Sequence, residues 1–262
     1  MILSVPHVPY LPQRIISLVP SQTELLFTLG LDQEIIGITK FCKYPAEWFK
    51  HKTRVGGTKT LNISLIKKLN PDLVIANKEE NEKQQVELVG DIANTWVTDV
   101  SSLDSAITML NDIGKLCHKS EEAASLALSI LKEFSSLPPP PAQKIGAAYL
   151  IWKDPYMVAG GGTFIEDMMT HCGLKNIFSD RKRYPEITTA DLMMPQADEQ
   201  LCELLILSSE PYPFAEKHII EMQEQLPNIK IVLADGEMFS WYGSRLLLAP
   251  AYFNDFMKRI RT

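Results

Sequence analysis

Short apolar runs alternate with helix-like segments through the first hundred residues of the chain. The apolar runs predict strands of a parallel sheet that is covered on both faces, and they cover residues 15–19, 35–39, 73–76 and 96–98. Capping and stop residues between these runs predict helices over residues 21–29, 62–69 and 80–94. Strands that alternate with helices in this way are typical of a parallel sheet wound with helices.

The first strand and the first helix are separated by a single residue, Pro20, in the stretch RIISLVPSQTELLFTLG. Ser21 and Glu24 have the S-x-x-E spacing of a capping box, so we expect the helix to begin at Ser21 and to end at Gly30. Such a helix directs free N–H groups beyond the carboxyl edge of the sheet. Ligands of open α/β sheets bind at that edge.

Residues 103–137 carry no strand pattern. The apolar positions Ala127, Ile130, Leu131 and Phe134 follow helical spacing, which predicts an amphipathic helix over at least residues 120–135. Four consecutive prolines at 138–141 end it. Beyond them the alternation resumes, and Pro250 should kink the final helix or mark its true start.

The pattern predicts an α/β fold with two parallel-sheet lobes, a single long helix joining them and a ligand cleft between the lobes. The expected parts are an N-terminal lobe (1–102), a connecting helix segment with a polyproline linker (103–141) and a C-terminal lobe (142–262). The alternative is one continuous doubly wound domain in which the prolines form an ordinary loop.

Charge and hydropathy restrict the partners of this chain of 262 residues. Its formal charge of −6 and its pI near 5.5 argue against nucleic acid and against anionic membranes. No apolar run approaches the roughly 18 residues that span a bilayer, so no membrane insertion is expected. A small-molecule ligand is the expected partner.

The amino terminus, MILSVPHVPYLPQR, has neither a basic region nor an apolar run of about seven or more residues. As written, the sequence predicts a cytoplasmic protein, and a longer true amino terminus would make it periplasmic. The cysteines lack a C-x-x-C pair, which favours reduced thiols and leaves disulfides open; they are Cys42, Cys117, Cys172 and Cys202.

Catalytic and metal-binding patterns are absent from the loops. Neither G-x-S-x-G nor H-E-x-x-H occurs, and the five histidines fall on the terminus or on expected helices. We therefore expect no catalytic residue, no metal site, no intrinsic cofactor and no enzyme activity.

Aromatic and charged residues gather in the loops that follow the expected strands. A cleft lined in this way suits a large organic ligand, although some of these rings will instead cap the core of their own lobe. The candidate ligand-binding residues are Phe41, Tyr44, Thr58, Lys59, Lys78, Glu79, Tyr156, Tyr184, Glu210, Tyr212, Glu237, Phe239, Trp241 and Arg245.

Several stretches together resemble the helical-backbone (class III) substrate-binding proteins of ABC importers. They are RIISLVPSQTELLFTLGL, VGGTKTLN, LNPDLVIA, GGGTFIEDMMTHCGLKNIF and RYPEIT. The likeness runs from Arg14 to about Phe253 and is nearest to the cobalamin-binding and iron-siderophore-binding branch, with haem binders beside it. It implies non-catalytic binding of a corrinoid, a haem-like molecule or a ferric siderophore.

The resemblance also implies roles for particular positions. Aromatic rings from both lobes grip the corrin in the cobalamin binders, and the matching positions here are Phe41 or Tyr44, Tyr156, Tyr184 and Phe239. This sequence departs from them with Thr58 in place of a tryptophan. It departs again with Glu237 and Trp241 in place of an Asp–Arg pair.

An ABC permease is a further partner that the resemblance implies. Family members dock through one exposed glutamate from each lobe, and the matching positions here are Ser64 and Ala190, with Asp191 beside the second. The docking glutamates are therefore absent. The alternative function is a cytosolic enzyme or metabolite sensor that uses charges at the cleft mouth, which are Lys40, Lys59, Lys78, Glu79, Glu80, Glu210, Glu237 and Arg245.

Overall fold

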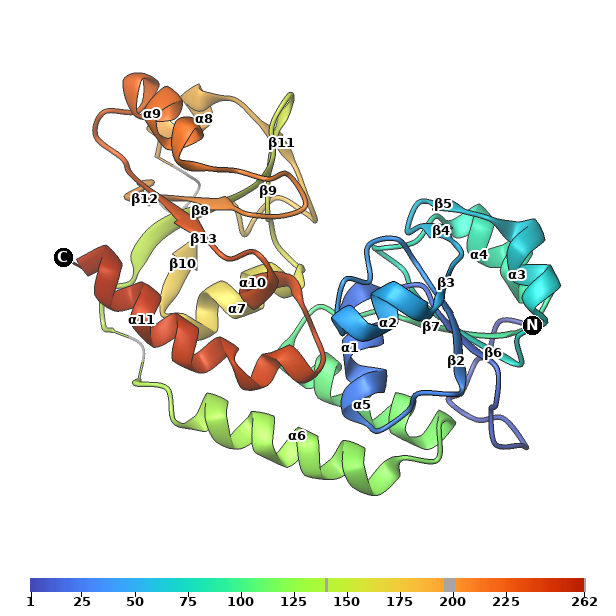
Figure 1. The fold of residues 1–262 in the computed structure, drawn as a ribbon. Coiled ribbons are helices and arrows are strands. Elements are labelled where there is room, and N and C mark those ends of the chain that lie inside the picture. Colours follow the sequence, from blue (N-terminus) through green and yellow to red (C-terminus); the bar gives the residue numbers. More distant parts are fainter. Residues whose placement is uncertain (140, 196–200, 262) are drawn as a thin grey trace. The chain divides into compact units, whose positions relative to one another are not determined.

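The computed structural model describes residues 1–139, 141–195 and 201–261. The chain divides into two compact units, and each is a sheet with helices packed around it (Figure 1). The N-terminal unit contains Met1–Val100, Asp104–Leu131 and Tyr242–Arg245. The C-terminal unit contains Ser101–Leu103, Lys132–Trp241 and Leu246–Thr262. The α/β fold class expected from the sequence is confirmed.

The sheet of the N-terminal unit has five strands in the order β3-β2-β1-β6-β7, and all its pairs are parallel. The strands are β1 (Ile15–Ser17), β2 (Ile35–Ile38), β3 (Thr53–Arg54), β6 (Leu73–Asn77) and β7 (Asn94–Thr98). Every residue of β1 and β6 is buried, as expected for central strands covered on both faces. A hairpin of β4 (Gly56–Gly57) and β5 (Thr60–Leu61) lies outside this sheet.

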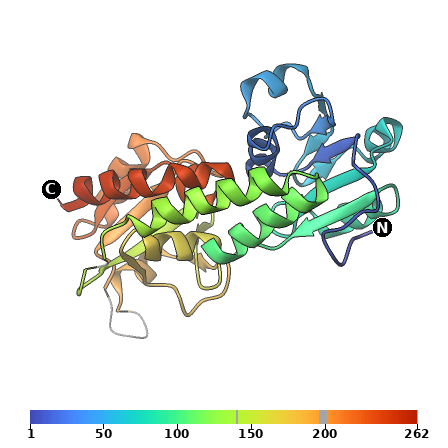
Figure 2. The same cartoon turned by 90° about the horizontal axis from the view of Figure 1, so that it is seen from below.

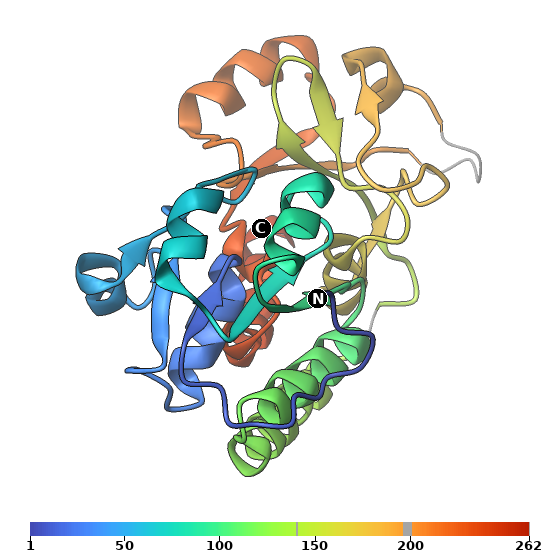
Figure 3. The same cartoon turned by 90° about the vertical axis from the view of Figure 1, so that its right-hand side faces the viewer.

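The helices that connect these strands are α1 (Pro20–Thr28), α2 (Ala46–His51), α3 (Ile63–Leu69) and α4 (Lys83–Gly90). The start of the chain adds to the far edge of the sheet, where Ile2 forms a parallel bridge with Thr95 of β7 (Figure 3). The Asn62 side chain accepts a hydrogen bond from the backbone N–H of Leu65, so the N-cap expected for α3 is confirmed.

The capping box expected at Ser21 is wrong. Helix α1 begins one residue earlier, at Pro20, and its N-cap residue Val19 makes no side-chain cap bond. Proline suits this first position because its φ is already helical and it has no N–H to satisfy. Glu24 is used elsewhere, in an ion pair with Arg245. A contact distant in sequence has replaced the local one.

The region 103–137 forms two helices, α5 (Leu103–Leu116) and α6 (Ser120–Ser135), and the expected helix 120–135 is confirmed as α6. His118 has a φ of 54°, in the left-handed region that a helix cannot continue through. Figure 2 shows α5 and α6 as successive green helices with this turn between them. The buried positions of α6 include Ala127, Ile130 and Phe134, whereas Leu131 is exposed.

The C-terminal sheet is mixed, whereas the sequence pattern predicts a parallel sheet. The parallel strands are β8 (Ile145–Trp152), β10 (Leu174–Asn176), β12 (Leu204–Ser208) and β13 (Lys230–Ala234). The short strand β9 (Tyr156–Val158) pairs antiparallel with β8 on one side and with β11 (Glu186–Ile187) on the other. Only residues 153–155 separate β8 from β9, too few for the crossover that a parallel pair needs.

The helices of the C-terminal unit are α7 (Phe164–His171), α8 (Thr189–Met193), α9 (Glu216–Gln225), α10 (Glu237–Ser240) and α11 (Ala249–Arg261). A 3₁₀ turn, η1 (Ser244–Leu247), precedes α11. Pro250 lies in the first turn of α11 and therefore marks the start of the final helix. Among the described residues, no helix is both long and apolar enough to cross a bilayer.

Candidate functional site

The strand order of the N-terminal sheet identifies one crevice as its natural binding position. Strand β1 lies in the middle, with β2 on one side and β6 on the other. The chain therefore leaves β1 in one direction and later returns to its other side, which makes the β1–β6 boundary a topological switch point. Two segments meet there at the carboxyl edge: the first turn of α1 and the loop after β6.

Two buried asparagines fix the loop after β6. The Asn77 side-chain oxygen accepts the backbone N–H groups of Glu79 (2.8 Å) and Glu80 (3.1 Å). The Asn81 side chain accepts the backbone N–H of Asn77 (2.9 Å) and donates to the carbonyl oxygen of Thr58 (3.1 Å). These bonds replace the first turn of the helix expected over 80–94, so α4 begins only at Lys83. The two asparagines therefore hold the backbone of this loop in place.

The candidate ligand-binding residues of the N-terminal unit include accessible aromatic rings and charged side chains that already bind other groups of the same unit. The Phe41 and Tyr44 side chains are 46% and 39% exposed, so both rings are open to a ligand. The Lys59 ammonium donates to the carbonyl oxygen of Glu79. The Lys78 ammonium pairs with Asp99 at 2.6 Å. Thr58 itself is buried.

Arg245 reaches the N-terminal unit from the far end of the sequence. Its guanidinium forms a bidentate ion pair with Glu24, at 3.0 Å to Oε2 and 2.6 Å to Oε1. The same group lies 4.4 Å from the centre of the Tyr44 ring, in a cation–π contact. The sequence placed Arg245 among the ligand contacts, and nothing in the sequence pattern linked it to Glu24. The pair fixes Arg245 as an anchor for Tyr242–Arg245.

In the C-terminal unit, a partly buried carboxylate organizes the loops after β12 and β13. Glu210 Oε1 accepts hydrogen bonds from the Ser240 hydroxyl (2.6 Å) and the Trp241 indole N–H (2.8 Å). Glu237 begins α10, and its N–H donates to the Asp235 carboxylate (3.1 Å). Glu210 therefore has a structural role in addition to the ligand contact expected of it.

The loop aromatics of this unit form a second group of rings. Trp152, at the end of β8, is 41% exposed and makes an edge contact with Tyr212 at 5.7 Å between ring centres. Tyr156 and Tyr184 are half-buried. Trp152 is not among the candidate ligand-binding residues predicted from the sequence. Its position at the end of an apolar strand could have identified it as one.

Two residues that the sequence analysis predicts to contact the ligand are instead buried within their own unit. Phe239 is 0% exposed and packs on Tyr149, Phe253 and Phe256, with ring centres 5.1, 4.8 and 5.8 Å away. Trp241 is 8% exposed, and its indole N–H is held by Glu210. The alternative that some loop aromatics cap the core of their own unit is right for both residues.

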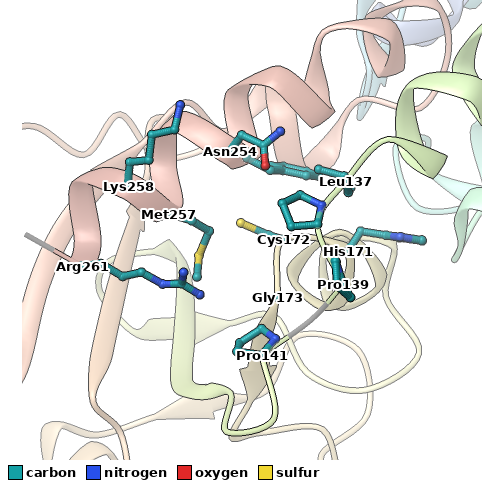
Figure 4. Close-up of a pocket in the computed structure, with 12 residues that line it drawn as sticks. Leu137, Pro139, Pro141, His171, Cys172, Gly173, Asn254, Met257, Lys258 and Arg261 are labelled. Atoms are coloured by element: carbon teal, nitrogen blue, oxygen red, sulfur yellow. The ribbon is translucent and has the colours of Figure 1, made fainter.

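A cavity of about 460 Å³ lies in the C-terminal unit, at the opposite end of its strands (Figure 4). It is lined by Pro138, Pro139 and Pro141, by the end of α7 and by the last turns of α11, with Cys172 and Met257 among the lining residues. β8 and β10 begin beside it, so it lies at their amino ends. None of the candidate residues lines it, and ligands of α/β sheets bind at the other edge.

Titratable groups at these sites show no metal-binding arrangement. In the parts of the chain that the structure describes, no group of three or more His, Cys, Asp or Glu side chains could hold a metal ion. The four cysteines are buried free thiols, and burial raises the pKa of Cys117, Cys172 and Cys202 to about 12. These thiols stay protonated and pack as small apolar groups.

The sequence model of one family, described as periplasmic binding protein, matches residues 15–198. The chain belongs to the periplasmic binding protein family. A vitamin B12-binding protein of Pectobacterium carotovorum is 26% identical over 245 residues, which cover 91% of this chain and 86% of that protein. Proteins of this family bind small-molecule ligands, as expected from the sequence.

Solved structures show the same fold. The periplasmic vitamin B12 binding protein of Vibrio cholerae aligns with a TM-score of 0.75 at 19% identity, over 97% of this chain and 100% of that one. The periplasmic heme binding protein of the same organism aligns with a TM-score of 0.77 at 17% identity, over 94% and 98% of the two chains. The two-lobed α/β architecture of the family is therefore shared.

The two positions that match the docking glutamates of the family are both exposed. Ser64 lies in the first turn of α3 and Ala190 in α8. The carboxylate beside Ala190, that of Asp191, is engaged within its own unit. It accepts the Thr188 hydroxyl (2.7 Å) and backbone N–H (2.8 Å), and it pairs with Arg181 at 2.9 Å. Asp191 thus closes a capping box on α8.

Substitution Asp191→Ala is expected to destabilise the C-terminal unit by about 1–2 kcal/mol, because it removes a capping box and an ion pair. The hydrogen bonds from Thr188, followed by the Arg181 contact, lower the pKa of Asp191 to about 2. A depressed carboxyl pKa stabilises the fold above the unfolded value near pH 4, and this stability is lost as the pH falls towards 2.

Urea unfolding of the wild type and Asp191→Ala at pH 7 and pH 2.5 measures this effect. The difference between the two proteins should shrink at the lower pH. The matched control is Asp104→Ala, which removes an exposed carboxylate from the first turn of α5 and should cost less than about 0.5 kcal/mol. Equal effects of the two substitutions at pH 7 would contradict the capping role.

Proposed function

We propose that this protein binds a large metal-chelate ligand, of the corrinoid, haem or ferric siderophore class, and catalyses no reaction. The family match over residues 15–198 carries the proposal, because it covers most of the N-terminal unit and extends well into the C-terminal unit, and because the relatives of the chain include vitamin B12-binding proteins. The ligand would contact side chains at the carboxyl edges of the sheets, where open α/β folds bind their ligands.

The chemistry of these edges supports a broad, partly apolar ligand. The N-terminal unit exposes Phe41 and Tyr44, and the C-terminal unit exposes Trp152 beside Tyr212. Large rings that remain accessible in the free protein offer flat apolar surface at low conformational cost, which suits a macrocycle. The Lys40 ammonium lies 5.1 Å from the centre of the Phe41 ring and adds a cation beside it.

We further propose that the bound ligand is passed to an ABC permease. The exposed Ser64 and Ala190 would then require a docking contact other than the paired glutamates of the family. Capture for import takes place in the periplasm, whereas a cytoplasmic protein would bind its ligand after import. Fractionation of cells that produce the native gene product distinguishes these two cases.

Titration of tryptophan fluorescence with cyanocobalamin, haemin and ferrichrome tests the ligand class. At least one chelate should quench the emission with saturable one-to-one binding and a Kd in the micromolar range or tighter, about −8 kcal/mol or below. Calorimetry on the same samples corrects for absorption by the coloured ligands. The absence of saturable binding to all three chelates would refute the proposed function.

A matched pair of tryptophan variants locates the binding surface. Trp48→Phe changes a ring that is 1% exposed and donates its N–H to Asp32, so it should leave the quenching in place. Trp152→Phe removes the exposed reporter at the end of β8 and should lose part of the quenching. The opposite result would place the ligand away from the carboxyl edge of the C-terminal sheet.

A further inference from the structure

The cavity at the amino ends of the C-terminal strands is far from the carboxyl edge at which this fold binds its ligands. Strand β8 extends over eight residues from Ile145 to Trp152, so its two ends are roughly 23 Å apart. The cavity lies beside the start of this strand, and the exposed Trp152 ring lies at its end. A volume of about 460 Å³ is within the usual range of small-molecule sites. The cavity is therefore large enough for a second, separate ligand.

One wall of the cavity is apolar and donates no backbone hydrogen bonds. It consists of Pro138, Pro139 and Pro141, whose pyrrolidine rings leave no backbone N–H. Figure 4 shows the Met257 thioether and the Cys172 thiol directed toward one another beside this wall. Pyrrolidine rings and thioethers both pack well on flat aromatic groups. These side chains suit the aromatic ring of a ligand.

Only basic and neutral residues line the cavity. None of its described lining residues is an aspartate or a glutamate, whereas His171, Lys258 and Arg261 all belong to the lining. The whole chain has a formal charge of −6, so this lining differs in sign from the rest of the protein. A cavity lined in this way attracts an anion and repels a cation.

Arg261 is the basic side chain that is available to such an anion. Its guanidinium extends from the last turn of α11 into the cavity (Figure 4), and within the described residues it has no ion pair or hydrogen bond. Lys258 instead points away from the cavity and pairs with Asp255 at 3.0 Å. His171 Nε2 lies 3.6 Å from the carboxylate of Asp167. The cavity therefore offers one positive charge.

The walls on both sides of the cavity are held by contacts within the C-terminal unit. The end of α11 is fixed because the Lys230 ammonium donates to the Ile260 carbonyl (2.8 Å) and the Phe253 side chain is buried. Gly173 has a φ of 85°, which turns the chain from α7 into β10, and a Cβ added there would contact Pro141. The walls thus keep their positions without a ligand, which lowers the cost of binding one.

We propose that this cavity binds a small aromatic monocarboxylate, with its ring on the proline wall and its carboxylate on the Arg261 guanidinium. The planar guanidinium presents two parallel N–H groups to a carboxylate, a geometry that an ammonium cannot reproduce. A second negative charge on the ligand would lie against the apolar wall without a partner, so the site favours a single charge. This inference goes beyond the proposed function, because it concerns the opposite end of the strands.

Nuclear magnetic resonance on protein with methyl-labelled methionines tests the site with 1-naphthoate as the probe. The Met257 signal, identified by its loss in Met257→Leu, should shift saturably with a Kd below about 1 mM, the range expected for so small a ligand. The exposed Met193 and Met194 serve as internal references and should not shift. The uncharged analogue 1-naphthalenemethanol has the same rings and should bind about fivefold more weakly or worse.

A matched pair of arginine variants tests the charge contact. Arg261→Gln should weaken 1-naphthoate binding about fivefold or more and should leave 1-naphthalenemethanol within about twofold, because only the carboxylate loses its partner. The control is Arg259→Gln, which removes a cation from the same turn of α11 but does not line the cavity, and it should change neither affinity. Arg261 is exposed, so its substitution should leave the fold intact, as thermal unfolding will show.

A cavity-filling variant tests the location independently. Cys172→Leu places a larger side chain in the cavity and should weaken both probes, since it removes space for their shared rings. If this variant does not fold, the comparison of Arg261→Gln with Arg259→Gln still decides the proposal.

Three results would overturn the proposal. They are an unshifted Met257 signal, equal binding of the acid and the alcohol, and equal affinities of Arg261→Gln and Arg259→Gln for 1-naphthoate. Displacement of 1-naphthoate by cyanocobalamin or haemin would also overturn it, by placing the probe at the chelate site. Failure of the chelate titrations would refute the proposed function and leave this second site in place.

Discussion

Substitution Phe239→Ala is expected to destabilise the C-terminal unit by about 3–5 kcal/mol, the usual cost of emptying a fully buried phenylalanine site. The ring is 0% exposed and contacts aromatic residues from two different elements, Tyr149 of β8 and Phe253 and Phe256 of α11. These neighbours are themselves fully buried. They cannot collapse into the space without breaking their own packing, so a cavity should remain.

The matched control for this change is Phe41→Ala in the N-terminal unit. That ring is 46% exposed, so its removal should change the free energy of unfolding by less than about 0.5 kcal/mol. It should nevertheless weaken ligand binding, because the ring offers accessible apolar surface at the carboxyl edge. Urea unfolding and the fluorescence titration, run on both variants, measure the two effects separately.

A Phe239→Ala protein with wild-type stability and lost ligand affinity would restore the ligand contact expected from the sequence. The conservative variant Phe239→Leu should lose less stability than the alanine variant, because leucine fills part of the same space. This order is a signature of core packing, and a ligand contact through the aromatic face would not produce it.

Substitution Arg245→Met is expected to cost about 3 kcal/mol of stability in the N-terminal unit. The side chains of Arg245 and Glu24 are only 11% and 20% exposed, so the change leaves a largely desolvated carboxylate without its partner. The bidentate geometry adds to the loss, and so does the cation–π contact with Tyr44. Methionine keeps most of the length of the side chain, so the effect reports mainly on the charge.

The double variant with Glu24→Gln should recover part of this stability, because the unpaired charge is then removed. An exposed ion pair supplies the control. Lys83 and Glu87 lie 3.9 Å apart with side chains 87% and 54% exposed, so Lys83→Met should cost less than about 0.5 kcal/mol. Equal effects of the two single substitutions, measured by urea unfolding at pH 7, would exclude the anchoring role of Arg245.

The sequence predicted elements well where the signal was local and repeated. Helix α6 has the bounds expected from its apolar spacing, and the apolar run 73–76 lies in a fully buried strand, β6. The prediction from sequence failed where a residue distant in the chain formed a contact that replaced the local pattern. Ser21 and Glu24 have capping-box spacing, but Glu24 binds Arg245, and Pro20 starts the helix without a side-chain cap.

The sequence by itself determined that this protein alternates strands and helices, that its binding loops follow the strands, and that it resembles a ligand-binding family. These properties depend on periodicity and on residues close together in the chain. The tertiary structure decided which loop side chains are accessible. Phe41 and Phe239 both follow a strand closely, yet one is 46% exposed and the other 0%. Burial is set by neighbours far away in sequence, as the packing of Phe239 against Tyr149 of β8 shows.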